Sequence, residues 1–147
     1  MSSAHALTAP GTEPLTRADY RALAEFRHQI RSFLSFSERA ARALGIEPQQ
    51  HQLLLALKGL PENRRSTIGT VAERLCVEHH TAVTLTDRLE AAGLVRRSRS
   101  SNDRREVLLS ITEQGEAILS RLSALHRDQL LTVGPKLQRA LAAIVDV

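Results

Sequence analysis

The sequence has one cysteine, few aromatic residues and no long apolar run. Aromatics make up 3% of its 147 residues against 42% for all apolar residues, so any core must be aliphatic. A single cysteine excludes an intrachain disulfide, which suits a reducing cytosol, and we expect a cytoplasmic location. Without a long apolar run we expect no membrane-spanning helix, and the first residues lack the basic and apolar regions of a secretory signal.

Signatures of the common enzyme classes are also missing. The chain has no glycine-rich phosphate loop, no pair of carboxylates at a recognisable catalytic spacing and no G-x-S-x-G motif. Adjacent His79 and His80 would point to different sides of a helix, and the other histidines show no metal-ligand spacing. We therefore expect a protein that is not an enzyme and that holds neither a metal nor a cofactor.

Lysine is rare as well, because only Lys58 and Lys136 among the twenty basic residues are not arginine. The planar arginine fork matches phosphate geometry, so this bias suits phosphate binding, although a GC-rich genome would produce it too. The length fits one domain. Residues 1–15, rich in proline, glycine, serine and threonine, predict a flexible tail, followed by a single domain over residues 16–147.

The most strongly patterned stretch covers residues 66–112. It opens with two segments of helical periodicity, whose apolar positions are Ile68, Val71, Ala72 and Leu75, then Ala82, Leu85, Leu89 and Ala92. Thr67 can cap the first segment, and Gly93 suits the left-handed position after the second. Because only Cys76–Glu78 link the two, the helices must cross sharply, which predicts a helix-turn-helix.

A β-hairpin is predicted directly afterwards. Val107, Leu109 and Ile111 recur at strand periodicity, and residues 94–98 can pair with them. The connecting residues 99–105 are polar and contain the turn formers asparagine and aspartate. Two helices followed by such a ribbon predict a winged helix-turn-helix.

Positive charge is concentrated on the same ribbon. Between Arg88 and Arg105 six arginines face only Glu90 and Asp103, a balance of +4, which equals the net charge of the whole chain. Basic charge confined to one ribbon and its neighbouring helix is typical of a phosphate-binding surface. A solvated arginine cluster without a partner is the alternative.

This region resembles the DNA-binding lobe of the MarR family of bacterial transcription regulators. The family typically shows D-R-L-E, G-L-V or G-L-I, a D-x-R wing motif and a strand end close to L-x-L-T. The corresponding segments are residues 86–90, 93–95, 103–105 and 108–112, followed by Gly115. Their order and spacing fit the family, and the likeness extends over about residues 16–147.

The resemblance implies a mainly α fold with a small β-hairpin wing. Residues 48–112 would form the winged helix-turn-helix lobe, and residues 16–45 and 113–147 the dimerisation helices. It also implies a homodimeric transcription regulator, usually a repressor, that binds double-stranded DNA at a palindromic operator and releases it when a small-molecule effector binds. A winged-helix protein-interaction module and an architectural DNA-binding protein without an effector remain the alternatives.

The flanking segments predict long helices with apolar stripes. Thr16 and Asp19 form a capping box for a helix that reaches about Leu44 and stops at Gly45. Pro48 suits the start of a central helix, in which four leucines are expected to be buried, Leu53, Leu54, Leu55 and Leu57.

A second long helix is expected after the cap residue Thr112 and is predicted to break at Gly134 and Pro135 before a last short helix. Apolar stripes on both long segments would be unusual on a monomer, which favours a twofold dimer.

Candidate DNA contacts fall on the second helix of the motif and on the wing. The helix would place its N-terminal part on base edges in the major groove, and the wing would lie at the minor groove. The candidates are His79, His80, Thr81, Thr84, Arg88, Arg96, Arg97, Arg99, Asp103, Arg104 and Arg105. Arg64 and Arg65 are expected to contact the DNA backbone as well. Asp103 is expected to hold the wing by pairing with an arginine.

Two further features have alternative interpretations. Cys76 stands where helix-turn-helix motifs often have glycine, and it is either a small buried side chain or an oxidation sensor. All four aromatic residues lie in the first long helix, where they belong either to the core or dimer interface or to a ligand pocket. The candidate effector-binding residues are Phe33, Phe36, His51, Leu54 and Ile118.

Overall fold

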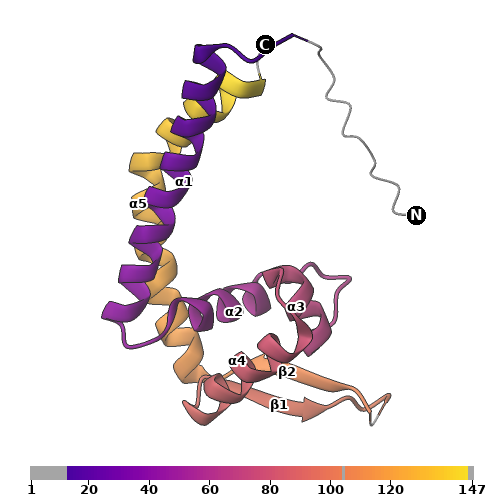
Figure 1. The fold of residues 1–147 in the computed structure, drawn as a ribbon. Helices are drawn as coiled ribbons and strands as arrows, with labels where there is room; N and C mark the ends of the chain where they lie inside the picture. The colour runs from indigo at the N-terminus through magenta and orange to yellow at the C-terminus, as the bar shows by residue number, and fades with distance from the viewer. Residues whose placement is uncertain (1–12, 104, 146–147) are drawn as a thin grey trace, which may run out of the picture.

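A long helical arm and a small lobe make up the molecule (Figure 1). The computed structural model describes residues 13–103 and 105–145, so most of the predicted tail and Arg104 lie outside the described residues. The arm consists of α1 (Arg17–Ala43) and α5 (Glu113–Val145), which run antiparallel side by side. The lobe contains α2 (Pro48–Lys58), α3 (Ile68–Leu75), α4 (His79–Ala91), β1 (Val95–Arg99) and β2 (Val107–Ile111). The predicted fold class is confirmed.

Helix α1 begins and ends as the sequence predicts. The Thr16 hydroxyl accepts from the Asp19 N–H at 3.2 Å, and the Asp19 carboxylate accepts from the Thr16 N–H at 2.8 Å. This reciprocal pair satisfies two amide groups that a helix N-terminus leaves without partners. At the other end Gly45 adopts φ +83°, a conformation that residues with a Cβ rarely take.

Helix α2 is central to the lobe, but it is not buried on every side. Pro48 occupies the first turn, and Leu53 and Leu54 are fully buried. Leu55 is 45% exposed, so the expectation that all the leucines of this helix are buried is wrong. The physical reason is that one face of α2 is turned toward a cleft beside the arm rather than into the core.

The helix-turn-helix is formed by α3 and α4. The Thr67 hydroxyl caps α3 by accepting from the Thr70 N–H at 3.2 Å, as predicted. Cys76 at the end of α3 has φ +54°, so a cysteine occupies the left-handed position that glycine usually fills. Its side chain is exposed, so the interpretation as a small buried residue is wrong. Ala92, assigned to the buried face of the second helix, is also exposed because it follows the last turn of α4.

The hairpin pairs β1 with β2 in antiparallel register, from Val95 opposite Ile111 to Arg99 opposite Val107. The predicted first strand is therefore shifted by one residue. The Leu109 N–H donates to the carbonyl of Ser66 at 2.8 Å, which joins β2 to the segment that enters α3. The ribbon is thus anchored to the helix-turn-helix.

Helix α5 differs from the prediction because it continues unbroken to Val145 with Pro135 inside it. Proline cannot donate a backbone hydrogen bond, and its ring crowds the preceding turn, at a cost of about 3 kcal/mol. Residues of α5 beyond Pro135 nevertheless pack along α1, next to Ala22, Glu25 and Gln29. Tertiary packing supplies most helix stability in proteins, and here it outweighs the local penalty.

The core lies where the lobe meets the base of the arm. It is aliphatic, as the composition predicts, and its buried members come from both parts: Ala41, Ile46, Leu53, Leu54, Val71, Leu85, Leu89, Leu94, Val95, Leu109, Leu119 and Leu122. None of the described helices is both long enough and apolar enough to cross a membrane.

Candidate nucleic-acid interface

The outer face of α4 is polar and exposed. Ala82, Leu85 and Leu89 are buried against the lobe, so the helical period turns other side chains outward. The exposed predicted contacts on this helix are His79, His80, Thr84 and Arg88, and Thr81 is half-buried beside them. His80, Thr84 and Arg88, spaced four positions apart, share one helix face, which therefore offers donors, acceptors and a methyl group together.

Thr84 has its hydroxyl proton engaged within the helix. Its Oγ1 donates to the carbonyl of His80 at 3.1 Å. While this bond persists, the hydroxyl can accept a hydrogen bond from a base edge but cannot donate one, and its methyl group remains available for a thymine methyl. Thr84 can therefore contact a base in two ways, by accepting a hydrogen bond or by packing its methyl group against thymine.

The arginines of β1 lie on both faces of the hairpin, one exposed and one facing inward. Successive side chains on a strand point to opposite faces. Arg96 is exposed opposite Ser110, whereas Arg97 lies opposite buried Leu109 on the inner face. Arg96 and Arg97, both predicted to contact the DNA backbone, therefore point to opposite faces of the hairpin.

Arg97 instead joins the ribbon to α4. Its guanidinium donates to the carboxylates of Asp87 at 2.6 Å and Glu90 at 2.8 Å. The hydrogen bond with Asp87 is the main cause that raises the pKa of Arg97 above its usual value, with Glu90 adding to it. A guanidinium held by two carboxylates braces the wing against the helix, and the phosphate contact of Arg97 stays a prediction.

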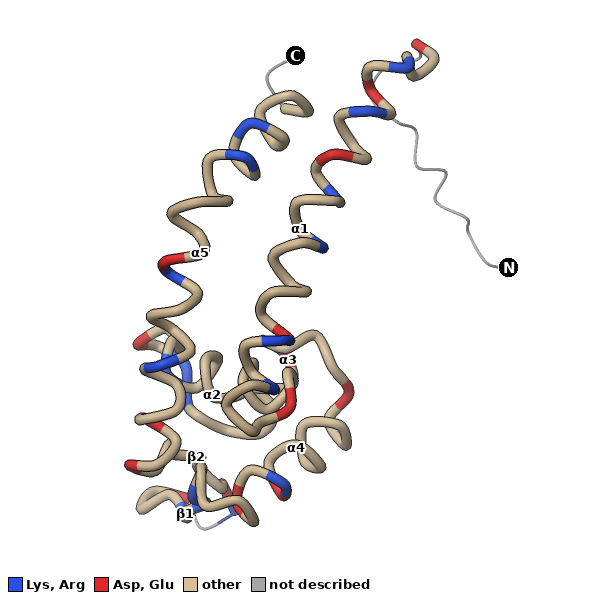
Figure 2. The backbone as a smooth tube through the Cα atoms, turned by 90° about the vertical axis from the view of Figure 1, so that its left-hand side faces the viewer, with Lys and Arg blue, Asp and Glu red and all other residues tan. Residues whose placement is uncertain are grey.

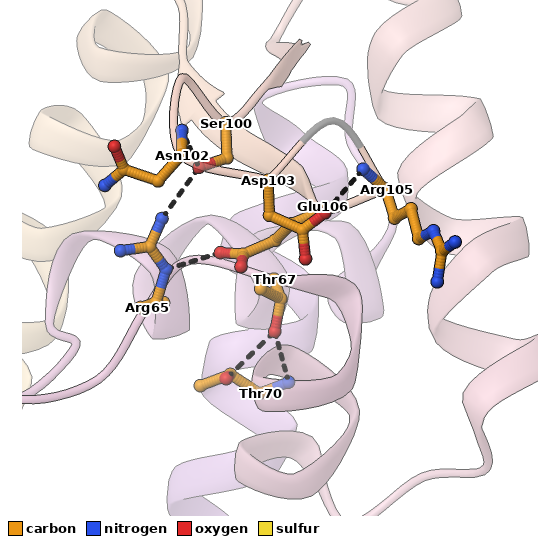
Figure 3. Close-up of polar contacts among 8 residues, drawn as sticks. All are labelled: Arg65, Thr67, Thr70, Ser100, Asn102, Asp103, Arg105 and Glu106. Carbon is orange, nitrogen blue, oxygen red and sulfur yellow. Dashed lines mark hydrogen bonds and ion pairs between the residues drawn. The ribbon is translucent and has the colours of Figure 1, made fainter.

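The wing loop is the connection between β1 and β2, which starts at Ser100 and ends at Glu106. Hydrogen bonds among its described residues fix its shape (Figure 3). The Asp103 carboxylate accepts from the Arg105 N–H at 2.9 Å, so it shapes the turn. Among the described residues it pairs with no arginine side chain, which differs from the prediction. The Ser100 N–H donates to the Glu106 carbonyl at 3.0 Å and closes the loop at its base. The Arg105 guanidinium points away from this cluster, and the predicted contact Arg104 lies outside the described residues.

The two arginines before α3 form ion pairs with carboxylates. Arg64 donates to Glu73 of α3 at 2.6 Å, and Arg65 donates to Glu106 at the base of the wing. The hydrogen bond with Glu73 raises the pKa of Arg64, and the same bond lowers the pKa of Glu73. Both arginines predicted to contact the DNA backbone are thus ion-paired within the protein.

The remaining basic side chains flank the outer face of α4. Among the residues that the structure describes, Arg88, Arg96 and Arg105 are exposed and take part in no ion pair. Arg99 is exposed on the wing strand as well. Figure 2 shows the basic segments of α4 and β1 at the end of the molecule opposite the chain termini. The arrangement can hold a polyanion across helix and ribbon.

A cleft of about 400 Å³ lies between the arm and α2. Of the five predicted effector contacts, Phe33 and His51 line it, while Phe36, Leu54 and Ile118 do not. Leu54 is fully buried in the core, and Ile118 packs against that core. The lining residues that sequence reasoning missed are Leu55, Ser123, His126, Arg127, Leu130 and Leu131. The helical spacing of Ser123, Arg127 and Leu130 on α5 was the available signal.

Two histidines meet in this cleft, with ring centroids 4.8 Å apart. His126 of α5 is fully hydrogen-bonded, because Nδ1 contacts the Leu122 carbonyl at 2.6 Å and Nε2 contacts the Ser37 hydroxyl at 2.7 Å. His51 of α2 is 2% exposed, and its Nδ1 has no hydrogen-bond partner among the described residues. Burial, and secondarily the charge that His126 can carry, lower the pKa of His51 to about 4, so His51 is neutral at pH 7. Neither histidine belongs to a cluster of three or more metal-ligating side chains, and the described part of the chain holds no such cluster.

Comparison with known proteins points to one family. The sequence pattern of the MarR family matches residues 44–106, which span the lobe from the end of α1 to the wing. The organic hydroperoxide resistance transcriptional regulator of Bacillus subtilis is 39% identical over 61 residues, covering 42% of this chain and 42% of that protein. The HTH-type transcriptional repressor MdtR of Bacillus subtilis is 32% identical over 72 residues, covering 49% of this chain and 44% of that protein.

These sequence matches span less than half the length of each relative. The fold match is longer. AbsC, a MarR family transcriptional regulator from Streptomyces coelicolor, superposes with a TM-score of 0.70 at 21% identity, over 83% of this chain and 82% of that one. The shared fold therefore includes the arm as well as the lobe. The family's sequence pattern thus lies in the lobe of this chain, and arm and lobe together have the fold of MarR family regulators of known structure.

Proposed function

We propose that the protein is a transcription regulator that binds a palindromic DNA operator as a homodimer and acts as a repressor. The observation that carries this proposal is the exposed polar face of α4, with His80, Thr84 and Arg88, beside a ribbon with exposed arginines. A helix of this width enters the major groove, while a basic ribbon beside it reaches the backbone or the minor groove. The role of MdtR as a repressor supports the direction of control.

Dimerisation is supported by apolar side chains that the arm exposes. Leu131 is 75% exposed and Val145 is 63% exposed, and other large apolar residues of the arm are exposed too, among them Tyr20, Leu23, Leu34, Leu125, Leu130 and Leu141. Large apolar side chains exposed in this number are unusual on a monomer and indicate an association surface. A twofold dimer would present two copies of α4, as a palindromic site requires.

Response to a small molecule is supported by the cleft at the junction of arm and lobe. Its lining combines α1, α2 and α5, so an occupant would contact both the dimerisation helices and the DNA-binding lobe. A ligand that prefers one spacing of the two lobes shifts the dimer toward that spacing, and DNA is released if it requires another. We propose that the cleft is the effector site.

DNA binding is tested by footprinting on the intergenic DNA next to the gene, at several salt concentrations. If the dimer neutralises about six to ten phosphates, its affinity falls by roughly 10³–10⁵ between 50 and 200 mM salt. We expect protection of two half-sites related by a dyad. Binding that is independent of salt, or protection of a single half-site by a monomer, would refute the proposal.

The effector role is tested by a thermal-shift screen of small molecules, because a ligand that binds only the folded state raises the melting temperature. We expect a compound that stabilises the protein also to release it from its operator. A stabilising compound that leaves the DNA affinity unchanged would show that occupation of the cleft is not coupled to DNA binding.

A further inference from the structure

One guanidinium, that of Arg65, contacts both residues that close the wing loop (Figure 3). Its Nε donates to the Glu106 carboxylate, and its Nη2 donates to the Ser100 hydroxyl at 3.2 Å. Ser100 and Glu106 are themselves joined by a backbone hydrogen bond of 3.0 Å. Arg65 therefore reaches from the segment before α3 to the residue that follows β1 and the residue that precedes β2, at the base of the wing.

We propose that Arg65 is a positioning residue for DNA binding, which sets the angle between the wing and the helix-turn-helix without contacting phosphate itself. This inference rests on the proposed function, because it concerns how two DNA-contacting elements are held relative to each other. It also replaces the sequence-based expectation that Arg65 is a backbone contact.

The acceptor atoms of this contact are built into the fold. Ser100 is 5% exposed, and its Oγ also accepts from the Asn102 N–H at 3.3 Å, so the atom that Arg65 contacts is fixed by the loop. The next residue, Ser66, accepts from the Leu109 N–H of β2 at 2.8 Å. Two consecutive residues before α3 thus hold the wing, one through its side chain and one through its carbonyl.

The Arg65–Glu106 contact contributes little to the free energy of unfolding of the whole protein. The Arg65 side chain is 54% exposed and that of Glu106 is 25% exposed, and ion pairs in such positions add little to the free energy of unfolding. The ribbon also remains attached to α4 through Arg97 when Arg65 is removed. Loss of Arg65 should therefore loosen the wing while the lobe stays folded.

A mobile wing weakens DNA binding, because the wing must then become ordered when DNA binds and this ordering costs free energy. Immobilising flexible side chains and loops opposes association, and we expect about a tenfold loss of affinity for Arg65→Ala. The loss should be local. Hydroxyl-radical protection of the minor groove beneath the wing should disappear, while guanine contacts in the major groove, which belong to α4, should persist.

Glu106→Ala separates positioning from phosphate binding, because the two roles predict opposite signs. If Arg65 contacted phosphate, removal of Glu106 would release the guanidinium and remove a negative charge near DNA, so the affinity would rise. If Arg65 positions the wing, Glu106→Ala should weaken binding about as much as Arg65→Ala does and should remove the same minor-groove protection.

Arg64→Ala is the matched control. It removes one arginine from the same segment and breaks one ion pair, but its partner Glu73 lies in α3 and not in the wing. Protection beneath the wing should be retained in this variant, whatever its affinity. All variants are first compared by thermal melting, since a general loss of folding would weaken major- and minor-groove contacts in parallel.

The outcomes are distinct. Tighter or unchanged binding by Glu106→Ala, or retained minor-groove protection in Arg65→Ala, would overturn the positioning role while the proposed function stands. A wild-type protein that binds no DNA at all would overturn the proposed function and this role together. Parallel loss by Arg65→Ala and Glu106→Ala, with the wing footprint alone removed, is the result that we expect.

Discussion

In the described part of the chain, one ring nitrogen of buried His51 has no hydrogen-bond partner, whereas both ring nitrogens of its neighbour His126 are hydrogen-bonded. Protonation of such a ring costs free energy, because the charge is removed from water and lies beside a second histidine. The lowered pKa of His51, about 4 against an ordinary value of 6.5, expresses that cost. The cleft therefore contains a titratable group that is neutral near pH 7.

The stability of the protein should fall as the pH is lowered from 6.5 to 4. In this window the unfolded chain binds the His51 proton and the folded chain does not, so protons favour unfolding. The shift from 6.5 to about 4 corresponds to a loss of about 3 kcal/mol. Urea denaturation at several pH values measures this slope. His51→Gln should flatten it, whereas His28→Gln, which changes an exposed histidine of α1, should not; equal slopes in both variants would contradict the assignment.

Cys76 should be easier to replace by glycine than by any other residue. Its φ of +54° costs about 1–2 kcal/mol for a residue with a Cβ, and its exposed side chain contributes little packing. Glycine removes that strain but adds entropy to the unfolded chain, so Cys76→Gly should stabilise by about 0.5–1 kcal/mol. Cys76→Ala keeps the strain and should change stability little. A Cys76→Gly protein that melts below Cys76→Ala would show that the turn is not strained.

At this scale the sequence predicts residue types better than their partners. The basic ribbon was correctly located, but Arg97 was assigned to DNA although the strand alternation turns it toward α4. Asp103 was correctly expected to support the wing, yet its partner is a backbone N–H. Pairing depends on which groups the fold brings within 3 Å, and a charge pattern along the chain does not contain that information.

The first turn of α5 is hydrogen-bonded to and closely packed against the start and end of the hairpin. The Thr112 hydroxyl donates to the Gly93 carbonyl at 2.6 Å and accepts from the Gly115 N–H at 3.1 Å. Gly115 is buried so closely that an added Cβ would lie 2.2 Å from the Leu94 carbonyl oxygen and 2.7 Å from a methyl group of Ile111. This joint fixes the direction in which the arm leaves the lobe.

Gly115→Ala should therefore destabilise the protein by about 2–3 kcal/mol or more, because backbone must move to admit the methyl group. Gly134→Ala in the same helix is the control, since its added Cβ meets nothing within 4 Å. There alanine should stabilise by about 0.5–1 kcal/mol, the usual gain over glycine inside a helix. Chemical denaturation of both variants measures the change in the free energy of unfolding, which should be negative for Gly115→Ala and positive for Gly134→Ala. An unchanged free energy of unfolding in Gly115→Ala would mean that the backbone around Gly115 is not closely packed.

Element boundaries were predictable wherever a local signal sets them. The caps at Thr16, Thr67 and Thr112 and the left-handed Gly93 are all found in the structure. The predicted break at Pro135 failed because the local penalty of a proline competes with the packing of α5 along α1. That packing is a tertiary effect, and its strength cannot be judged from the residues around the proline.

The arm and lobe together create features that neither has alone. The cleft depends on contacts such as that between His126 and Ser37, which are 89 positions apart in the sequence. Sequence reasoning named two of its lining residues and missed those of α5, because the register of two antiparallel helices is not encoded in either helix separately. The exposed apolar face of the arm, by contrast, follows directly from the stripes in the sequence.

That face should hold two copies of the chain together. Leu141 is 44% exposed and borders an apolar groove on α5 that also includes Leu130, Leu131 and Leu137. In a dimer Leu141→Asp would bury an unpaired carboxylate, at a cost of several kcal/mol. Thr132→Asp is the matched control: it adds the same charge to the same helix, but nine residues from position 141, which turns it about half a revolution away from the groove.

Sedimentation at micromolar concentration distinguishes the outcomes. Wild type and Thr132→Asp should sediment as dimers, and Leu141→Asp as a monomer or an aggregate. The Leu141→Asp monomer should also lose operator binding, because a single copy of α4 contacts only one half-site and forgoes the contribution of the second. A wild-type monomer that still protects both half-sites would show that the exposed face of the arm is not a dimer interface.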